Sequence, residues 1–98
     1  MIRRENDRMV IAGPATLRNI TQLLEVGFAQ VREGVAVVDL AEVTELDSSL
    51  LAATLAWIRE ARTLHRALVI ANPPKGLQTL AQLYGVEELL PPRSPPGQ

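Results

Sequence analysis

The sequence contains no cysteine and a single histidine, His65. The absence of cysteine excludes disulfide bonds, thiolate nucleophiles and zinc sites built on sulfur, and it fits a reducing cytoplasm. One histidine cannot form a multi-histidine metal site, and it leaves a serine-type triad with one candidate base. Most enzyme classes are therefore disfavoured, and we expect no catalytic residues, no metal and no other cofactor.

Aromatic residues and net charge are also scarce. The aromatic side chains are Phe28, Trp57 and Tyr84, and 10 Lys and Arg stand against 11 Asp and Glu, for a formal net charge of −1. Such a chain lacks the basic footprint and the stacking platforms of a nucleic-acid-binding protein. It also has no apolar run of about 18 residues and no signal-peptide pattern, so we expect no membrane insertion and a cytoplasmic location.

The hydrophobic residues, 47% of the chain, follow two alternating patterns. Short apolar runs rich in valine or isoleucine are typical of buried strands, and stretches with an apolar residue at every third or fourth position are typical of amphipathic helices. The expected strands are residues 9–13, 35–40 and 67–71, preceded by a weak edge strand, and the expected helices are residues 16–34, 47–65 and 76–84. Thr16 is the expected N-cap of the first helix.

This order predicts one small α/β domain over residues 1–90. Strands joined by helical crossovers pair in parallel, so we expect a small mixed sheet of about four strands with helices packed on it. A chain of this length buries enough surface for one core. The remaining residues 91–98 (PPRSPPGQ) are rich in proline and have nothing to bury, so they are expected to form a disordered tail.

Polar groups concentrate where the central strand meets the second helix. The stretch contains two adjacent serines and four carboxylates: Asp39, Glu42, Glu45 and Asp47. One interpretation is structural, with Asp47 or Ser48 capping the helix and the other acids ending the strand or facing solvent. The other is regulatory, because a phosphoryl group on Ser48 or Ser49 would lie at the positive end of the helix dipole and add about two negative charges beside the acids.

The order of elements and the stretch VAVVDLAEVTELDSSLLAATLAWI resemble the STAS domain (sulphate transporter and anti-sigma factor antagonist) over nearly the whole chain apart from the tail. Residues 46–50 (LDSSL) are similar to the Asp-Ser-Ser-Gly loop of this family. Residues 80–91 (LAQLYGVEELLP) resemble the ending of one branch, the STAS subunit of the bacterial Mla-type phospholipid-transport ABC system. The resemblance implies a non-enzymatic subunit that binds and regulates the cytoplasmic ATPase of such a transporter.

The resemblance also implies where a partner binds. Ser49 is at the position phosphorylated in anti-sigma factor antagonists, and Ser48 is where the lipid-transport branch carries a functionally important hydroxyl residue, often threonine. Leu50 stands where the family usually has glycine, so its bulk either obstructs a kinase or contacts a constant partner. We place the partner-binding and regulatory residues at Asp47, Ser48, Ser49, Leu50 and Trp57, with Ser49 and Ser48 as the expected phosphorylation sites.

The second helix has a wider apolar arc than one packing face requires. If the stripe that begins with Leu51 faces the sheet, Trp57 lies on its flank, where it either anchors a partner or is covered by the first helix or the tail. Leu83 and Tyr84 are expected in the core. His65, flanked by arginines at the end of this helix, complements the helix dipole.

These observations leave three hypotheses for the function. The first is an accessory subunit of an ABC-transporter ATPase, peripheral to the inner membrane through the complex. The alternative is an anti-sigma factor antagonist switched by a serine kinase at Ser49, and a homodimer is left open. The third, a hydrolase or phosphotransferase using Asp47, Ser48 and His65, fails on geometry, because about 17 helical residues separate Ser48 from His65 by roughly 25 Å.

Overall fold

Strands and helices alternate along the chain as expected. The computed structural model describes residues 1–90, so the expected tail lies outside the described residues. The elements in chain order are β1 (Ile2–Glu5), β2 (Arg8–Ala15), α1 (Ile20–Arg32), β3 (Val37–Leu46), α2 (Ser48–Thr63), β4 (Val69–Ala71), α3 (Lys75–Leu83) and the 3-10 helix η1 (Glu87–Leu89). Residues 1–90 include no helix that is long and apolar enough to cross a membrane.

The strands form one mixed sheet in the order β1-β2-β3-β4. β1 is an edge strand that runs antiparallel to β2, whereas β2 and β4 both pair in parallel with β3. The valine-rich strand β3 therefore has a partner on each side, as its continuous apolar sequence predicts. The prediction of an α/β fold with a small mixed sheet is confirmed.

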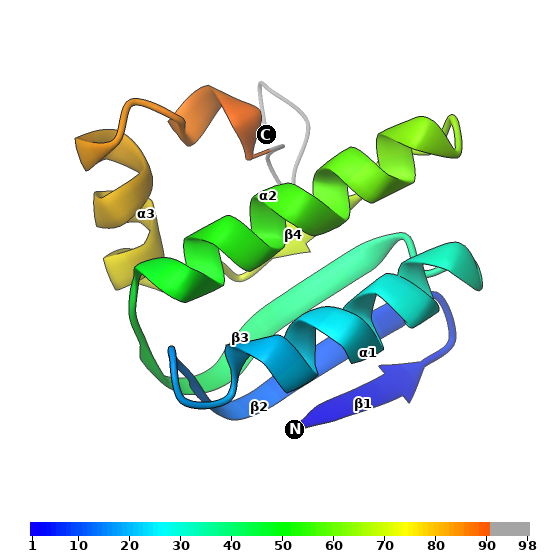
Figure 1. The fold of residues 1–98 in the computed structure, drawn as a ribbon, viewed down its shortest axis with the longest axis horizontal. Helices are drawn as coiled ribbons and strands as arrows, with labels where there is room; N and C mark the ends of the chain where they lie inside the picture. The colour runs from blue at the N-terminus through cyan, green and yellow to red at the C-terminus, as the bar shows by residue number, and fades with distance from the viewer. Residues whose placement is uncertain (91–98) are drawn as a thin grey trace.

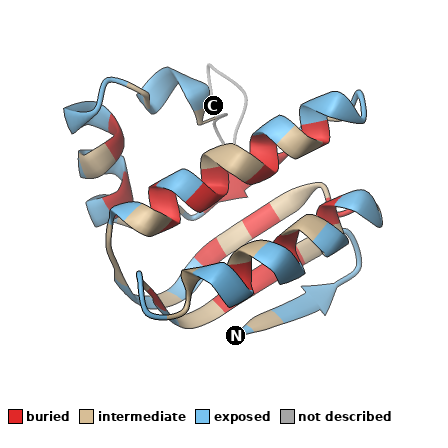
Figure 2. Cartoon of the chain, in the orientation of Figure 1, coloured by how far each residue is buried: buried red, intermediate tan, exposed pale blue. Residues whose placement is uncertain are grey.

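Helices α1 and α2 lie side by side over one face of the sheet (Figure 1). Each helix turns its buried residues toward the strands and its exposed residues toward solvent (Figure 2). The strand side chains beneath the helices are almost completely buried: Met9, Ile11, Val38, Leu40 and Ile70. The core is thus a single apolar layer between the sheet and two helices, and α3 packs against α2 beside it.

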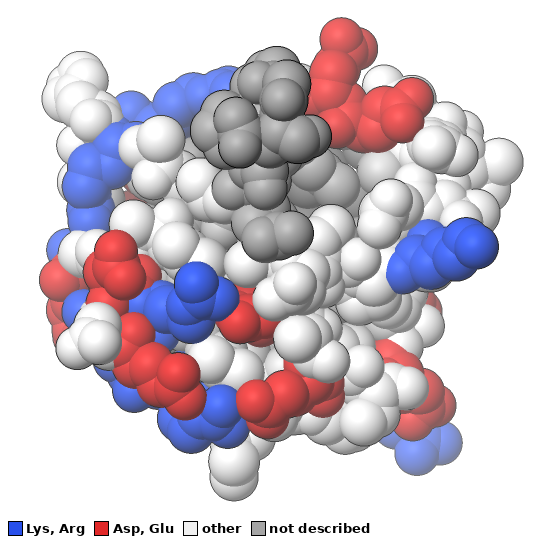
Figure 3. Space-filling view, turned by 180° about the vertical axis from the view of Figure 1, so that it is seen from behind, with Lys and Arg blue, Asp and Glu red and all other residues white. Residues whose placement is uncertain are grey.

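The opposite face of the sheet carries salt bridges that reach across the strands. Arg3 on β1 pairs with Glu42 on β3 at 2.9 Å, and Arg8 on β2 pairs with Asp39 on β3 at 2.6 Å. Val10, which lies between Arg3 and Asp39 in the strand register, is only 3% exposed although it is on this face. Figure 3 shows acidic and basic side chains interleaved on this side of the molecule.

Strand β3 continues through residues 41–46, where the sequence predicted a polar connection. The period-two pattern of a strand is hidden here because the pairing with β2 shifts register twice opposite residues 10–14. Such irregularities change which side chains turn toward the core. The core-facing residues Leu40, Val43 and Leu46 consequently recur at every third position instead of every second.

Helix α1 begins at Ile20, one turn later than the N-cap predicted at Thr16. The side chain of Asn19 accepts a hydrogen bond from the Thr16 amide at 2.9 Å and donates one to the Pro14 carbonyl at 2.7 Å. These bonds fold residues 16–19 into a turn before the helix. Leu17, the second residue of the helix expected over residues 16–34, lies on this turn and is 76% exposed.

Trp57 fills the space between α1 and α2. Its side chain is completely buried, and its indole nitrogen donates a hydrogen bond to the Leu24 carbonyl at 3.1 Å. The ring lies so close to Gly27 that a Cβ at this position would overlap it. The interpretation in which the first helix covers Trp57 is therefore confirmed, and the interpretation of Trp57 as an exposed interface anchor is wrong.

Replacing Gly27 by alanine is expected to destabilise the protein by about 2 kcal/mol, because the new methyl group must displace a buried indole ring. Gly76 in α3 provides the matched control, since a Cβ there would meet the Leu46 side chain at an ordinary 3.6 Å. The Gly76→Ala variant should be stabilised by up to roughly 1 kcal/mol. Urea unfolding followed by Trp57 fluorescence measures both, and equal effects would contradict the close packing on Gly27.

Candidate functional site

Asp47 joins two loops at the end of the molecule where β2 and β3 finish. Its backbone is extended, and its carboxylate caps the first turn of α2. Oδ1 accepts hydrogen bonds from the Ser49 amide at 2.9 Å and from the Ser49 hydroxyl. Oδ2 accepts one from the Leu17 amide at 2.8 Å, in the turn before α1. A single carboxylate therefore holds the start of α2 against the turn that leads into α1.

These hydrogen bonds hold the pKa of Asp47 below its usual range. The Ser49 hydroxyl contributes most, followed by the Leu17 amide, and both favour the charged form of the carboxyl group. Because the folded-state pKa is the lower one, the carboxylate stabilises the fold at pH values above its unfolded pKa of about 3.9. This contribution is lost as the pH falls through the folded-state pKa.

The two serines after Asp47 are placed differently. Ser48 is exposed on the outer side of the first turn of α2. Ser49 is half-buried, and its hydroxyl donates a hydrogen bond to Asp47. Of the two hydroxyl residues, Ser48 is thus the one that solvent or a partner reaches without any change in the loop.

Leu50 points into the core and does not reach the surface. Successive residues of an α-helix are rotated by about 100°, so a side chain two positions after an outward-facing one turns to the opposite side. Ser48 faces outward, and Leu50 is accordingly 0% exposed. The expectation that Leu50 contacts a partner or obstructs a kinase is therefore wrong, because replacing the family glycine by leucine fills the core beneath the loop.

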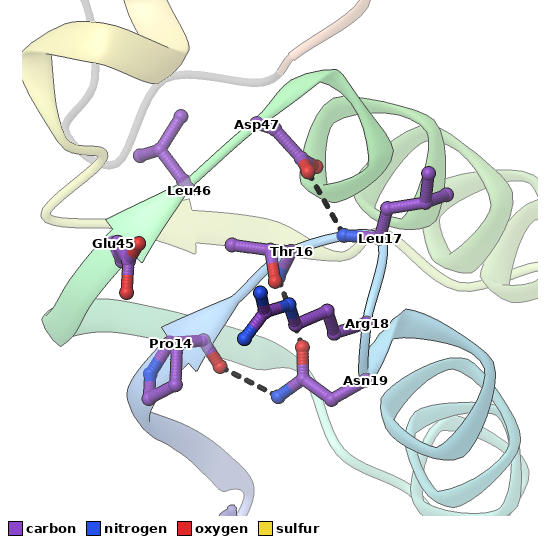
Figure 4. Close-up of a pocket in the computed structure, with 8 residues that line it drawn as sticks. All are labelled: Pro14, Thr16, Leu17, Arg18, Asn19, Glu45, Leu46 and Asp47. Atoms are coloured by element: carbon purple, nitrogen blue, oxygen red, sulfur yellow. Dashed lines mark hydrogen bonds between the residues drawn. The ribbon is translucent and has the colours of Figure 1, made fainter.

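A hollow of about 640 Å³ opens beside Asp47 (Figure 4). It is lined by the end of β2, the turn before α1 and the end of β3: Pro14, Thr16, Leu17, Arg18, Asn19, Glu45, Leu46 and Asp47. The exposed Leu17 side chain, the positive charge of Arg18 and the negative charges of Glu45 and Asp47 give it a mixed character. Such an open, mixed surface is typical of a protein contact, whereas small-molecule sites are concave and mostly apolar.

A second exposed apolar group lies on α3 and the chain that follows it. Leu83 is 75% exposed, Tyr84 is 57% exposed and Leu89 is 44% exposed, although the first two were predicted to lie in the core. Only one stripe of the short helix α3 is buried, through Leu77 and Ala81, and the helix ends at Leu83. The periodic pattern identified the helix correctly but could not show that its last turn projects beyond the core.

The four carboxylates expected around the serines do not form one cluster. Asp39 and Glu42 lie on the open face of the sheet and pair with arginines there. Partial burial raises the pKa of Asp39, but its hydrogen bonds, including one from Asn72 at 3.1 Å, outweigh this effect and hold the pKa below its usual range. Glu45 and Asp47 remain beside the hollow, so the acidic charge near Ser48 is smaller than the sequence indicated.

His65 lies beyond the far end of α2 from the serines, in a left-handed conformation with φ of 58°. Along α2, Ser48 and His65 are separated by roughly 25 Å at 1.5 Å per residue. The structure therefore does not bring Asp47, Ser48 and His65 together as a hydrolase would require. Within residues 1–90, no three His, Asp or Glu side chains are grouped so as to hold a metal ion.

An Asp47→Ala variant is expected to lose roughly 5 °C in Tm at pH 7, because it removes the N-cap of α2 and the bond to Leu17. Glu25→Ala, an exposed change on α1, is the control and should leave Tm nearly unchanged. The difference between wild type and Asp47→Ala should shrink below about pH 4, as Asp47 becomes protonated. Thermal unfolding followed by circular dichroism at pH 7 and pH 3 measures this, and an undiminished difference at pH 3 would contradict a role for the ionised carboxylate.

Comparisons with known proteins agree with this architecture. A family model described as "Mlab, STAS domain" matches residues 2–91. The fold is similar to that of the anti-sigma factor antagonist SpoIIAA in its unphosphorylated form, with a TM-score of 0.71 and 13% identity over 96% of this chain and 87% of that chain. It is also similar to the phosphorylated form of the Bacillus cell fate determinant SpoIIAA, with a TM-score of 0.65 and 15% identity over 96% of this chain and 90% of that chain.

A comparison with curated protein sequences gives no match. At identities of 13% and 15%, the two SpoIIAA structures establish a shared fold. The family model goes further, because it matches nearly the whole described chain, including the loop at Asp47 and the exposed ending of α3. This chain therefore belongs to the STAS-domain family.

Proposed function

We propose that this chain is a non-enzymatic STAS subunit that binds and regulates the ATPase of a phospholipid-transport ABC system. The observation that carries the proposal is the position of Ser48, exposed at the start of α2 while the neighbouring Ser49 is bonded to Asp47. In the lipid-transport branch that the sequence resembles, the functional hydroxyl is at the Ser48 position. The description of the matching family model, "Mlab, STAS domain", supports the same assignment.

The partner surface is proposed to be the end of the molecule that carries Leu17, Asp47 and Ser48. Leu17 offers an exposed apolar side chain, and the hydrogen bond from its amide to Asp47 fixes its position relative to Ser48. A surface that is already ordered loses less entropy on binding than a flexible loop does. An accessory subunit of this kind acts in the cytoplasm and lies at the inner membrane through its complex with the transporter.

An anti-sigma factor antagonist is the second candidate function, and the similarity to both forms of SpoIIAA favours it. Ser49 is at the position expected for phosphorylation, and the first turn of a helix tolerates a phosphoryl group. The added group would have to replace the hydrogen bond from the Ser49 hydroxyl to Asp47 and would repel the Asp47 carboxylate. Phosphorylation would therefore loosen the contact between the two loops, as a switch requires.

The first function predicts that the chain co-purifies with the ATPase subunit encoded beside its gene and changes the rate of ATP hydrolysis. Replacing Ser48 by arginine should reduce this effect about tenfold, because a large charged side chain would stand at the centre of the interface. Ser48→Thr should retain it, and Thr63→Arg, an equally bulky change at the far end of α2, is the control. If Ser48→Arg left the effect on the ATPase rate unchanged, or if no complex formed at all, this function would be contradicted.

The second function predicts a phosphate on Ser49 after incubation with ATP and a serine kinase encoded beside the gene. Mass spectrometry of the chain, with Ser49→Ala as the unmodifiable control, locates the phosphate. If the first function is right, Ser49 stays unmodified by a kinase that is active on another substrate. A stoichiometric phosphate on Ser49 would instead establish the antagonist.

A further inference from the structure

A shallow hollow lies between the first half of α2 and the chain that follows α3. Its volume is about 280 Å³, and its lining is mostly hydrocarbon: Ser48, Leu51, Ala52, Leu55, Tyr84 and Val86. Ser48 stands at its edge, so the hollow borders the proposed partner surface on the side away from Leu17. The space matches one large apolar side chain rather than a buried small molecule.

The stretch of chain that passes this hollow carries several exposed apolar residues, and one of them, Tyr84, lines the hollow. Leu83, Tyr84 and Leu89 are 75%, 57% and 44% exposed and belong to the same short stretch of chain. Apolar residues scattered singly on a surface are normal, but an exposed aromatic side chain such as Tyr84 beside an apolar hollow is typical of an interaction site. We call the six residues that line the hollow the α2–α3 surface.

The charges around the α2–α3 surface are acidic at one end. Glu87 and Glu88 follow Val86 directly and are exposed, and acidic atoms gather over η1 in Figure 3. No Lys or Arg lines the hollow itself. The first cation along this stripe of α2 is Arg59, one turn beyond Leu55. A complementary partner would bring positive charge to the η1 end.

We infer that the α2–α3 surface binds an amphipathic, basic segment of the partner, with a large apolar side chain in the hollow and Lys or Arg beside Glu87 and Glu88. This rests on the proposed function in taking the ATPase as the partner, and it adds a second contact on the other side of Ser48. Apolar anchors that fill a pocket dominate interface energies, and complementary charges set the orientation of the segment.

Two other occupants fit these features less well. In a symmetric pair of copies of this chain joined through the surface, neither hollow would bring a Lys or Arg to the Glu87 and Glu88 of the other copy, because none lines it. Residues 91–98 (PPRSPPGQ) contain no Leu, Ile, Met or Phe to fill the hollow. The experiments below distinguish both of these occupants from the basic segment.

The first test uses the ATPase complex. Ala52→Arg fills the hollow from an exposed helical position and leaves the core intact, so it should weaken binding to the ATPase about tenfold or more, whereas Thr63→Arg should not. If the wild-type complex forms and Ala52→Arg binds equally well, the inference is wrong while the proposed function stands. If no complex forms, the proposed function fails and the second test decides the inference alone.

The second test needs no ATPase. A helical peptide of about 15 residues, with leucine on one face and lysine on the other, is added to the isotope-labelled chain and followed by NMR. Amide shifts are expected around Ser48–Leu55 and Tyr84–Glu88, with binding at least about tenfold tighter than for the same peptide with glutamate in place of lysine. Shifts elsewhere, none at all, or equal binding of the two peptides would overturn the inference.

Charge and competing occupants are tested with the same peptide. Glu87→Gln combined with Glu88→Gln should weaken binding about threefold to tenfold and reduce its dependence on salt, whereas Glu25→Gln on α1 should change neither.

Removal of residues 91–98 should leave binding of the peptide unchanged. Much tighter binding after this removal, or dimers of the wild-type chain that Ala52→Arg dissociates, would assign the surface to the tail or to a second copy and overturn the inference.

Discussion

The geometry of the proposed partner surface depends on the Asp47 carboxylate. Its two oxygens accept hydrogen bonds from different loops, the turn before α1 and the first turn of α2. The buried Leu50 anchors the first turn of α2 in the core, whereas Leu17 in the turn before α1 is exposed and leaves that turn to be held by polar bonds. Because both are bonded to one charged group, the positions of Leu17 and Ser48 are fixed relative to each other, and a partner meets a surface that is ordered before it binds.

In the first turn of α2, the residue proposed to contact a partner and the residue that stabilises the core point in opposite directions. Ser48 faces outward and Leu50 faces inward, because two helical positions turn the chain by about 200°. A change at Ser48 can therefore alter a contact with little effect on the core, whereas a change at Leu50 would remove a fully buried side chain. The same separation recurs further along α2, where the buried Trp57 joins the two helices and leaves none of its ring for a partner.

The sequence predicted the order of elements, the mixed sheet and the loop at Asp47, because each depends on local patterns of apolar and capping residues. The predictions from the sequence failed where the structure depends on a contact between residues that lie far apart in the chain. Residues 41–46 lack the period-two pattern of a strand because β3 has one extra residue relative to β2 at each of two places, and only the pairing of the two strands reveals this. Leu17 fell within the first expected helix, and Tyr84 was expected in the core, but a turn held by the Asn19 side chain and the short length of α3 leave both exposed. The spacing of apolar residues along the sequence does not indicate contacts of this kind.

The charged open face of the sheet affects how copies of this chain can associate. Its interleaved Arg3–Glu42 and Arg8–Asp39 pairs present charged groups, of which only Asp39 is mostly buried, instead of an apolar surface, so stacking a second sheet on it would require removing water from these charges. Charges on sheet surfaces and edges oppose such self-association in many proteins. A charged flat face therefore opposes the stacking of copies through their sheets and leaves contacts with other proteins to the ends and helices of the molecule.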